Sequence, residues 1–442
     1  MIRVLAAAAV VVVLAAAPSA TGGRSASLTV AATSLQPRSS SAAIAWQAST
    51  PAKVVVAYGL TADYGVWSKP QLGRSGQALL GGLEPNTTYQ YRLIAGSGAA
   101  RAESRGSFTT GAIAPWTTAA TTKNALFLDW QPFFPRMVWQ SCLSEYATNL
   151  AAGINLFMGG CGGGKAQLAG LAGKAYSVLD AHADAGVDGR GLVGFFQPDE
   201  ADDSGARLAS LPPSKQSHRV SFITLSNHFF SAANPLPQGN PSYPKLIAPV
   251  DFVGFDLYPL QIWCRTDAFQ AVFQAQRELT ALAAGKPTYQ WIEASTWNGC
   301  GGKPRSPTPT TVRAETWLAI AGGARGIGYF PYYWSPAIAK AITGIDREIA
   351  ALAPALLGPE APLTTSAGTV YAGARSFDGA RYVIAVNASL KAAKATFTLP
   401  RLPTTVGWVY GEGRSVRVTK GTFTDSFAPL AVHIYIVAPA GW

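Results

Sequence analysis

The stretch that decides the fold is "LVGFFQPDEADD", residues 192–203, in which a continuous apolar run ends in four acidic side chains. Only 13% of the residues in the whole chain are charged, so this local gathering of acids stands out. A near-continuous apolar run is typical of a strand in a parallel sheet that is buried on both faces. The acids are therefore expected at the end of a buried strand.

Similar apolar runs recur between residues 124 and 361, and the stretches between them carry apolar residues at every third or fourth position. That spacing predicts amphipathic helices. Strands that alternate with helices indicate a parallel sheet, and eight such units in roughly 240 residues predict a TIM barrel. The eight predicted strands are residues 125–130, 154–158, 175–180, 192–198, 220–226, 252–259, 287–294 and 326–333.

The segments on either side of these units have a different sequence pattern. Residues 26–111 and 362–442 consist of short stretches of alternating apolar residues separated by turn residues, which predicts a β-sandwich on each side of the barrel. Residues 112–123 are small, Thr-rich and Pro-containing, as expected of a linker. The chain is also longer than one hydrophobic core usually supports, so two or three domains are expected from length alone, and these patterns indicate three.

The stretch "LEPNTTYQYRLIA", residues 83–95, resembles the fibronectin type III pattern. The resemblance covers about 85 residues of the first sandwich and implies a tyrosine corner, with a tryptophan in the core. The residues that carry it are Leu83, Pro85, Thr88, Tyr89, Tyr91 and Trp46. Such a module implies a spacer or a weak binding surface.

The N-terminal residues 1–25 have the layout of a secretory signal peptide. Arg3 supplies a positive charge, residues 4–17 form an apolar run, and small residues follow. Cleavage is expected between Ala17 and Ala26, and an uncleaved anchor is the alternative. No later apolar run is long enough to cross a bilayer, so the mature protein is expected to be soluble and secreted.

Four cysteines lie in the middle of the chain, and export would expose them to an oxidising environment that favours disulfides. Three connectivities are possible, and we favour pairing between sequence neighbours, Cys142 with Cys161 and Cys264 with Cys300. A metal site is the rival interpretation, but the spacing fits no familiar zinc pattern and the histidines are scattered. No metal or organic cofactor is expected. The four histidines are His182, His218, His228 and His433.

The formal net charge is +11, and it becomes +10 once Arg3 leaves with the signal peptide. A basic surface favours anionic partners such as cell-wall polymers. No Lys/Arg cluster has the density expected of a nucleic-acid-binding protein, so nucleic acid is not an expected partner.

Two glutamates end predicted strands of the barrel. Glu200 follows the fourth strand and Glu293 ends the seventh, and in a TIM barrel the active site lies at these strand ends. Strand alternation predicts that both carboxyls point inward, where they would face each other. Glycoside hydrolysis needs such a pair, one carboxyl as acid and one as nucleophile or base. The charge of Glu293 would raise the pKa of Glu200.

Three stretches, "GFFQPDEAD", "YQWIEAS" and "GGARGIGYFPYYW", resemble the fourth, seventh and eighth strands of the large clan of retaining TIM-barrel glycoside hydrolases. The resemblance implies that Glu200 is the acid/base, Glu293 the nucleophile, and Tyr332 and Trp334 an aromatic floor. The chain departs from the pattern at Asp199, where many members have Asn, so Asp199 is a rival for the acid role. The ending "FAPLAVHIYIV" also resembles the small β domain that follows such barrels.

Further strand-end residues are predicted to bind substrate, because polar and aromatic groups at the mouth suit a sugar. A packing role is the alternative for each aromatic residue and for Asp256, a buried ion pair for Glu293, and an acidic helix start for Glu200, Asp202 and Asp203. The full set of predicted binding residues is Asp129, Trp130, Asp199, Asn227, Asp256, Tyr258, Trp291, Trp297, Tyr332 and Trp334.

The sequence therefore predicts a secreted glycoside hydrolase that cleaves a poly- or oligosaccharide with retention of configuration. The basic charge favours an anionic or cell-wall polysaccharide. One alternative is a non-catalytic carbohydrate-binding or adhesion protein built on an inactive barrel. A metal-dependent phosphoesterase is the other, and the scattered histidines argue against it.

Overall fold

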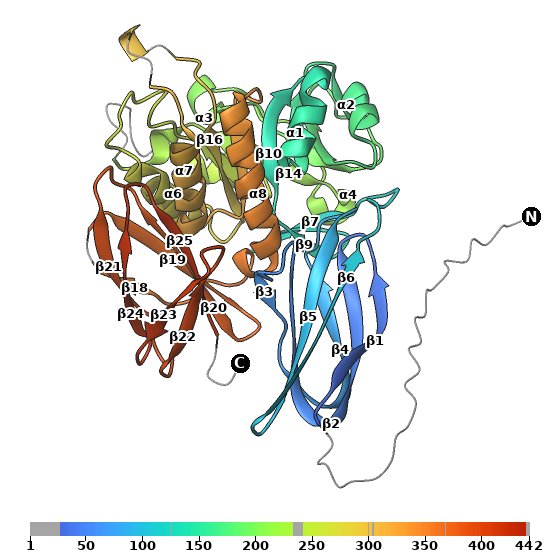
Figure 1. Cartoon of the computed structure of the whole chain (residues 1–442). Coiled ribbons are helices and arrows are strands. Elements are labelled where there is room, and N and C mark those ends of the chain that lie inside the picture. Colours follow the sequence, from blue (N-terminus) through green and yellow to red (C-terminus); the bar gives the residue numbers. More distant parts are fainter. Residues whose placement is uncertain are drawn as a thin grey trace, which may run out of the picture.

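The computed structural model describes residues 27–438 except 124, 233–241, 299, 303–304 and 367. The predicted signal peptide, residues 1–25, lies outside this part of the chain. A barrel with its helices forms the upper part of the molecule in Figure 1, and two β domains lie beneath it. The two β domains touch where Trp67 and Trp408 stack with their ring centroids 6.2 Å apart.

Eight parallel strands close into a barrel in chain order, which confirms the predicted barrel. Each strand pairs with the next, and the last pairs with the first. The strands are β10 (Arg136–Ser141), β11 (Leu156–Gly160), β12 (Tyr176–Asp180), β13 (Leu192–Phe196), β14 (Val220–Leu225), β15 (Phe252–Asp256), β16 (Thr288–Glu293) and β17 (Gly326–Phe330).

Helices follow the strands. The longest is α8, and the first residue of both α7 and α8 is proline, which needs no N–H partner there. Thr308 and Ser335 cap these two helices by accepting a backbone N–H through their side chains. The helices are α1 (Tyr146–Ala152), α2 (Gly164–Leu171), α3 (Ala201–Ser204), α4 (Ser214–Ser217), α5 (Tyr243–Ile247), α6 (Gln270–Leu282), α7 (Pro309–Gly322) and α8 (Pro336–Leu356).

The prediction for the first barrel strand is wrong. Residues 125–130 do not enter the barrel, because Asp129 and Trp130 adopt positive φ angles and turn the chain back in a tight hairpin. The hairpin strands are β8 (Ala125–Leu128) and β9 (Gln131–Phe133), and β7 (Ala119–Thr122) pairs with β8. The apolar side chains of this small sheet pack against the residues that begin β10, β11 and β12. The small sheet therefore closes the N-terminal end of the barrel.

Large aromatic side chains fill the barrel interior where glycines leave room. A Cβ atom on Gly254 would lie 2.0 Å from the ring of Tyr289, and one on Gly328 would lie 2.1 Å from the ring of Trp291. Both rings belong to one buried cluster that also contains Phe196. The barrel is thus a packed core without a pore, and ligands have to bind above it.

The N-terminal β domain is one sheet built around the long strand β2 (Ser41–Gly59). Trp46 is buried in its core, and the Tyr89 hydroxyl accepts a 2.9 Å hydrogen bond from the backbone N–H of Glu84. This contact fixes the turn before β5 (Thr88–Ser97). The other strands are β1 (Val30–Pro37), β3 (Val66–Trp67), β4 (Gln71–Gly81) and β6 (Ala100–Thr109).

The C-terminal β domain consists of two antiparallel sheets that share one buried cluster. One sheet has the order β19-β20-β25-β22-β23 and the other β18-β21-β24. The strands are β18 (Thr364–Thr365), β19 (Val370–Phe377), β20 (Ala380–Asn387), β21 (Ala393–Thr398), β22 (Thr405–Val409), β23 (Arg414–Val418), β24 (Thr422–Phe427) and β25 (Val432–Val437).

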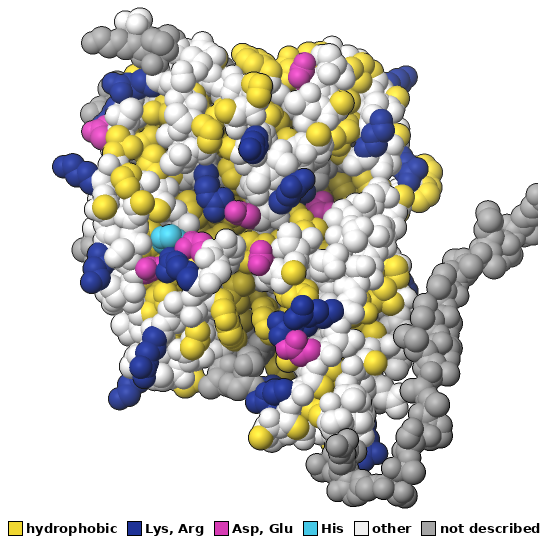
Figure 2. Space-filling view, in the orientation of Figure 1, with side chains coloured by type: hydrophobic (Ala, Val, Ile, Leu, Met, Phe, Trp, Pro, Cys, Tyr) yellow, Lys and Arg dark blue, Asp and Glu magenta, His cyan; other side chains and the backbone are white. Residues whose placement is uncertain are grey.

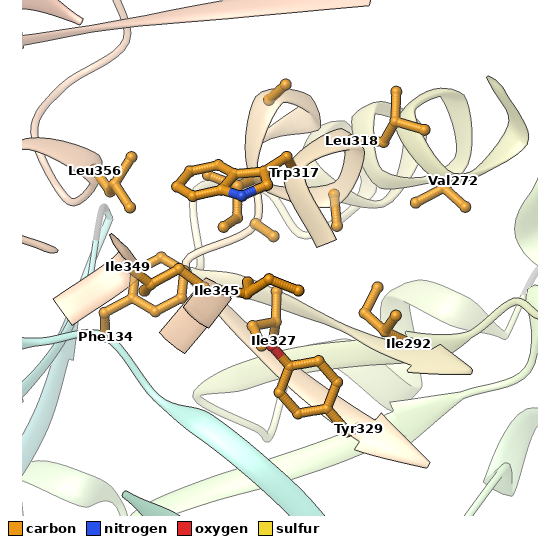
Figure 3. Packing of buried hydrophobic residues seen from close by; sticks show 14 of the residues in the cluster. Phe134, Val272, Ile292, Trp317, Leu318, Ile327, Tyr329, Ile345, Ile349 and Leu356 are labelled. Atoms are coloured by element: carbon orange, nitrogen blue, oxygen red, sulfur yellow. The ribbon is translucent and has the colours of Figure 1, made fainter. Parts of the chain in front are cut away.

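A second buried cluster joins this domain to the barrel. Figure 3 shows the indole of Trp317, on α7, among side chains from α8 and from the barrel strands. The same cluster includes Tyr382, Ile384 and Ile434 of the C-terminal sheets. The barrel and the C-terminal domain therefore share a continuous core.

Both disulfides join neighbouring cysteines, Cys142 with Cys161 and Cys264 with Cys300, which confirms the predicted pairing. The first ties the end of β10 to the loop after β11. The second ties the loop after β15 to the loop after β16. Among the described residues, no helix has both the length and the apolar character needed to cross a membrane.

A buried ionic network links the barrel to the N-terminal domain. The guanidinium of Arg136 lies 2.9 Å from the carboxylate of Glu84 and 3.7 Å from that of Asp346 on α8, and it donates to the Gly153 carbonyl. Arg136 is buried, and Asp346 is almost fully enclosed. Removing the guanidinium would leave two poorly solvated carboxylates without a cation.

We predict that Arg136→Ala lowers the free energy of unfolding by about 3–5 kcal/mol, because breaking a buried ion pair from one side strands its partner. Urea denaturation of the full chain measures this. The matched control is Arg277→Ala, which removes an exposed ion pair with Glu360 and should cost at most about 1 kcal/mol. Equal effects of the two substitutions would contradict the role given to Arg136.

Candidate active site

Glu200 lies at the mouth of the barrel in a strained backbone conformation. After β13 the chain continues along β14, with Gln197 N donating to Phe222 O and Glu200 N donating to Thr224 O. Glu200 then adopts φ 46° and ψ 46°, and α3 begins at the next residue. A left-handed conformation is costly for a residue with a Cβ atom, and such strain is concentrated at functional sites. The mouth faces away from both β domains (Figure 1).

The surroundings of Glu200 favour its protonated form. Burial, and then the negative charges of Asp199, Asp202 and Asp203, raise the pKa of Glu200 to about 7. The source of charge that we predicted, Glu293, is not among these neighbours. Glu200 is nevertheless poised to act as an acid near neutral pH.

Asp199 and Asp256 complete an acidic cluster with Glu200. Asp256 is two residues beyond Gly254, whose missing side chain would point at the ring of Tyr289, so Asp256 points inward as well. Burial, and then the charge of Asp199, raise the pKa of Asp256 well above its usual range. Loss of solvation and the charge of Asp202 raise the pKa of Asp199 to about 6.

Asp202 and Asp203 have structural partners. Asp202 accepts hydrogen bonds from the backbone and the hydroxyl of Ser226 and from the hydroxyl of Tyr243, at 2.8–3.0 Å. Asp203 lies 3.6 Å from His228. Asp202 therefore ties the start of α3 to the end of β14 and holds the loop that carries Glu200.

Aromatic rings line the mouth beside the acids. The ring of Tyr258 lies 5.0 Å from that of Trp297 and 5.8 Å from that of Phe330, and its hydroxyl donates to Asp256 at 2.7 Å. Trp139, at the end of β10, contacts the rings of Phe196 and Trp291. Trp139, Trp297 and Phe330 are partly exposed.

The predicted sugar-stacking role of Trp291 is wrong, because Trp291 is only 2% exposed and donates a hydrogen bond to Thr224 inside the barrel. The predicted floor of Tyr332 and Trp334 is also wrong. Both rings pack against the cluster outside the barrel, because the chain turns at Pro331 after β17. Phe330 takes the inner position instead.

Asp129 and Trp130 do not belong to the site, which corrects their predicted role in substrate binding. They form the hairpin turn at the opposite end of the barrel, where Asp129 accepts a hydrogen bond from Thr118 N and Trp130 is 76% exposed. Asn227 does follow the end of β14 as predicted. It is largely buried, and its Oδ1 atom has no donor among the described residues.

Glu293 ends β16, but its carboxyl is enclosed. Its exposure is 0%, and its two oxygens accept hydrogen bonds of 2.8 Å from the backbone N–H groups of Leu260 and Gln261. The carboxyl also contacts Glu315 on α7, outside the barrel. The predicted inward projection is therefore wrong for Glu293 in this conformation. Burial raises the pKa of Glu293 to about 7, although the two N–H donors act to lower it.

A short covering segment, residues 257–262, encloses Glu293. Gln261 holds this segment in place, because its side chain accepts from Trp297 N and Asn298 N and donates to the Arg305 carbonyl. Sequence reasoning missed Gln261, Phe330 and Glu315. The stretch around Glu315 was predicted as an amphipathic helix, and a lone acid among its apolar residues is the signal that could have found Glu315.

On the face seen in Figure 2, Lys and Arg side chains are spread over the surface, and several lie next to Asp or Glu side chains. Across the described residues, no group of three or more His, Cys, Asp or Glu side chains has an arrangement that could hold a metal ion.

No protein-family model matches the chain, and no curated protein matches its sequence. Among solved structures, a GH30 endoxylanase from Clostridium papyrosolvens C71 is 13% identical, covers 73% of this chain and 98% of its own, and has a TM-score of 0.41. A β-glucuronidase from Ruminococcus gnavus is 8% identical with a TM-score of 0.34, and one from Dictyoglomus thermophilum is 9% identical with a TM-score of 0.31.

Each glucuronidase covers 69% of this chain, and the chain covers 62% and 61% of their lengths. At these identities and TM-scores the likenesses identify no family.

We predict that Asp199→Asn lowers the pKa of Glu200, because it removes the largest charge that opposes ionisation of Glu200. Carbon-13 NMR of labelled glutamate side chains, titrated between pH 4 and 9, measures the change. Asp267→Asn is the control, since Asp267 is exposed and pairs with Arg265 away from the cluster. A Glu200 pKa that does not move in Asp199→Asn would contradict the proposed cluster.

Proposed function

We propose that this chain is a glycoside hydrolase that cleaves a poly- or oligosaccharide at the barrel mouth. The observation that carries the proposal is the environment of Glu200, a strained residue at the barrel mouth that belongs to the acidic cluster with Asp199 and Asp256, with partly exposed aromatic rings at the same mouth. Burial and the neighbouring acids raise the pKa of Glu200 to about 7. A general acid works best when its pKa lies near the working pH. Flat rings suit the apolar faces of pyranose sugars.

The proposed mechanism is a double displacement with Glu200 as acid/base and Glu293 as nucleophile. Glu200 gives its proton to the glycosidic oxygen while the Glu293 carboxylate attacks the anomeric carbon and the leaving group departs. Glu200 then removes a proton from water, which releases the sugar from Glu293. Each of the two displacements inverts the configuration of the anomeric carbon, so the two together retain it.

Two observations support Glu293 as the carboxylate. It stands at the end of the seventh barrel strand, and two N–H groups stabilise its ionised form. For Glu293 to reach a sugar, the side chains of the covering segment 257–262 that lie over Glu293 have to draw back, while the backbone N–H groups of Leu260 and Gln261 stay on its oxygens. Retraction of these side chains on substrate binding is therefore part of the proposal.

Substrate contacts are proposed for the polar groups around Glu200. Asp199 and Asp256 would accept hydrogen bonds from sugar hydroxyls, Tyr258 would orient Asp256, and Trp297 would offer a stacking face. Asn227 would supply an amide. The net basic charge favours an anionic or cell-wall polysaccharide as substrate.

The flanking domains are proposed as a fibronectin type III module and a β-sandwich. The bond from Glu84 N to the Tyr89 hydroxyl supports the first, because a tyrosine corner makes this contact. Two sheets around one core support the second. We also propose that the protein is secreted, and its two disulfides are consistent with an oxidising environment.

A second candidate function is favoured by the enclosure of Glu293. A barrel whose nucleophile position stays sealed would bind a glycan at its mouth without cleaving it. This is the non-catalytic carbohydrate-binding or adhesion protein considered above.

We predict that release of reducing ends from a panel of plant, fungal and bacterial polysaccharides falls by about 10²–10⁴ in Glu200→Gln, because general acid–base catalysis is lost. The activity of Glu293→Gln should fall by orders of magnitude as well, since an amide cannot serve as nucleophile. Glu278→Gln, a carboxyl that binds Ser231 near the surface, is the control and should keep full activity.

Two results would contradict the proposal. Full activity in either Gln variant at the mouth would remove that residue from the mechanism. Equal glycan binding by all variants, with no cleavage by any, would establish the binding protein instead.

We predict a narrow bell-shaped pH profile of kcat/KM centred near pH 7. Glu293 must be ionised and Glu200 protonated, and each pKa is raised to about 7, so activity falls on both sides. Initial rates between pH 4 and 9 on the cleaved glycan measure the profile. A broad plateau from pH 5 to 8 would show that these two groups do not control the rate.

A further inference from the structure

Glu315 is a buried carboxyl that the proposed mechanism does not use. It lies on α7, and its side chain is 0% exposed, like that of Glu293. The two carboxyl groups contact each other within hydrogen-bonding reach. Two acids therefore meet in a part of the protein that water does not reach.

The two carboxyls differ in their other partners. Glu293 accepts one backbone N–H on each oxygen, from Leu260 and from Gln261. Neither oxygen of Glu315 accepts from an N–H or hydroxyl group of the described residues. A negative charge is therefore stabilised on Glu293 and not on Glu315.

No cation of the part of the chain that the structure describes compensates the pair. Glu315 responds to burial and to Glu293, and to no other charged group. Most charged residues on the elements packed against α7 have other partners: Asp346 with Arg136, Glu348 with Arg313, Arg277 and Arg375 with Glu360, Glu278 with Ser231, His433 with Glu412, and Arg381 with the Ala380 carbonyl. The other two, Lys340 and Arg347 on α8, are exposed at the surface. Two adjacent charges without a cation would be strongly disfavoured in this interior.

We propose that Glu315 carries a proton and donates it in a hydrogen bond to Glu293, which makes Glu315 a positioning residue for the Glu293 carboxylate. The role in catalysis rests on the proposed function, whereas the shared proton does not. Burial raises the pKa of Glu315 well above its usual range and that of Glu293 only to about 7, so Glu293 ionises first.

The shared proton makes stability depend on pH. Glu315 is neutral in the folded protein, but in the unfolded chain it ionises above its ordinary pKa of about 4.3. When folding raises the pKa of an acid, the stability that results is fully present below the pKa of the unfolded chain. It is lost as the pH rises from there through the pKa of the folded protein. Glutamine at position 315 has no proton to lose and keeps an N–H donor for Glu293.

The first test compares the Tm of the wild-type protein and of Glu315→Gln from pH 5 to pH 8.5. We expect the Tm of the wild type to fall relative to that of the variant as pH rises. The control is Glu348→Gln on α8, whose carboxylate pairs with Arg313, and its Tm difference from wild type should stay constant. A constant difference for Glu315→Gln would overturn the proposal.

The second test locates the proton. Glu293→Gln should lower the Tm more than Glu315→Gln does, because the amide has one acceptor oxygen and its NH₂ group would face an N–H donor, either Leu260 N or Gln261 N. Equal effects would overturn the assignment of the proton to Glu315. This comparison also stands if a variant without any donor, Glu315→Leu, does not fold.

The third test measures catalysis. Loss of the donor in Glu315→Leu should raise the pKa of Glu293, so the acid limb of the pH profile of kcat should move to higher pH. Glu315→Gln keeps a donor, so its acid limb should lie where the wild-type limb lies. An equal shift of the acid limb in Glu315→Leu and Glu315→Gln would overturn the positioning role. If the wild-type protein cleaves no glycan, the proposed function fails, while the Tm comparisons still decide whether the proton is shared.

Discussion

The filled interior of the barrel is the constraint on which the site depends. Tyr289 and Trp291 occupy the space that Gly254 and Gly328 leave open, and Trp139 and Phe196 pack around Trp291. The interior leaves no room for a ligand, so the proposed substrate would rest on this aromatic layer. The groups that could meet it are those at the strand ends, where Asp199, Glu200 and Asp256 form their cluster.

The two glutamates meet very different surroundings. Glu200 lies among other acids at the mouth, whereas Glu293 is sealed under residues 257–262 with two N–H donors and a second carboxyl. Different surroundings are how two identical carboxyl groups come to act as acid and as base. The covering segment links the two environments. Gln261 and the Cys264–Cys300 disulfide hold that segment, so they also control access to Glu293.

The barrel could be predicted because its strands are continuous apolar runs, a pattern that follows from burial on both faces. The first strand was missed because "ALFLDW" is more apolar than "RMVWQS", although the Asp129–Trp130 turn keeps the former outside the barrel. The placement of Asp256 at a strand end was correct, whereas strand alternation failed at Glu293 and the family resemblance failed at Tyr332. Glu293 is the last residue of β16 and Tyr332 lies beyond β17, and the direction of each side chain depends on contacts from distant segments that the sequence pattern does not encode.

The most direct test of the account is to trap the covalent intermediate. A 2-fluoro glycoside of the sugar that the enzyme releases slows turnover of the glycosyl-enzyme, and peptide mapping by mass spectrometry then finds the labelled residue. The account predicts a label on Glu293, which requires that the side chains of residues 257–262 over Glu293 draw back. A label on Asp256 or Asp199 would show that the open acidic cluster supplies the nucleophile and would contradict the account.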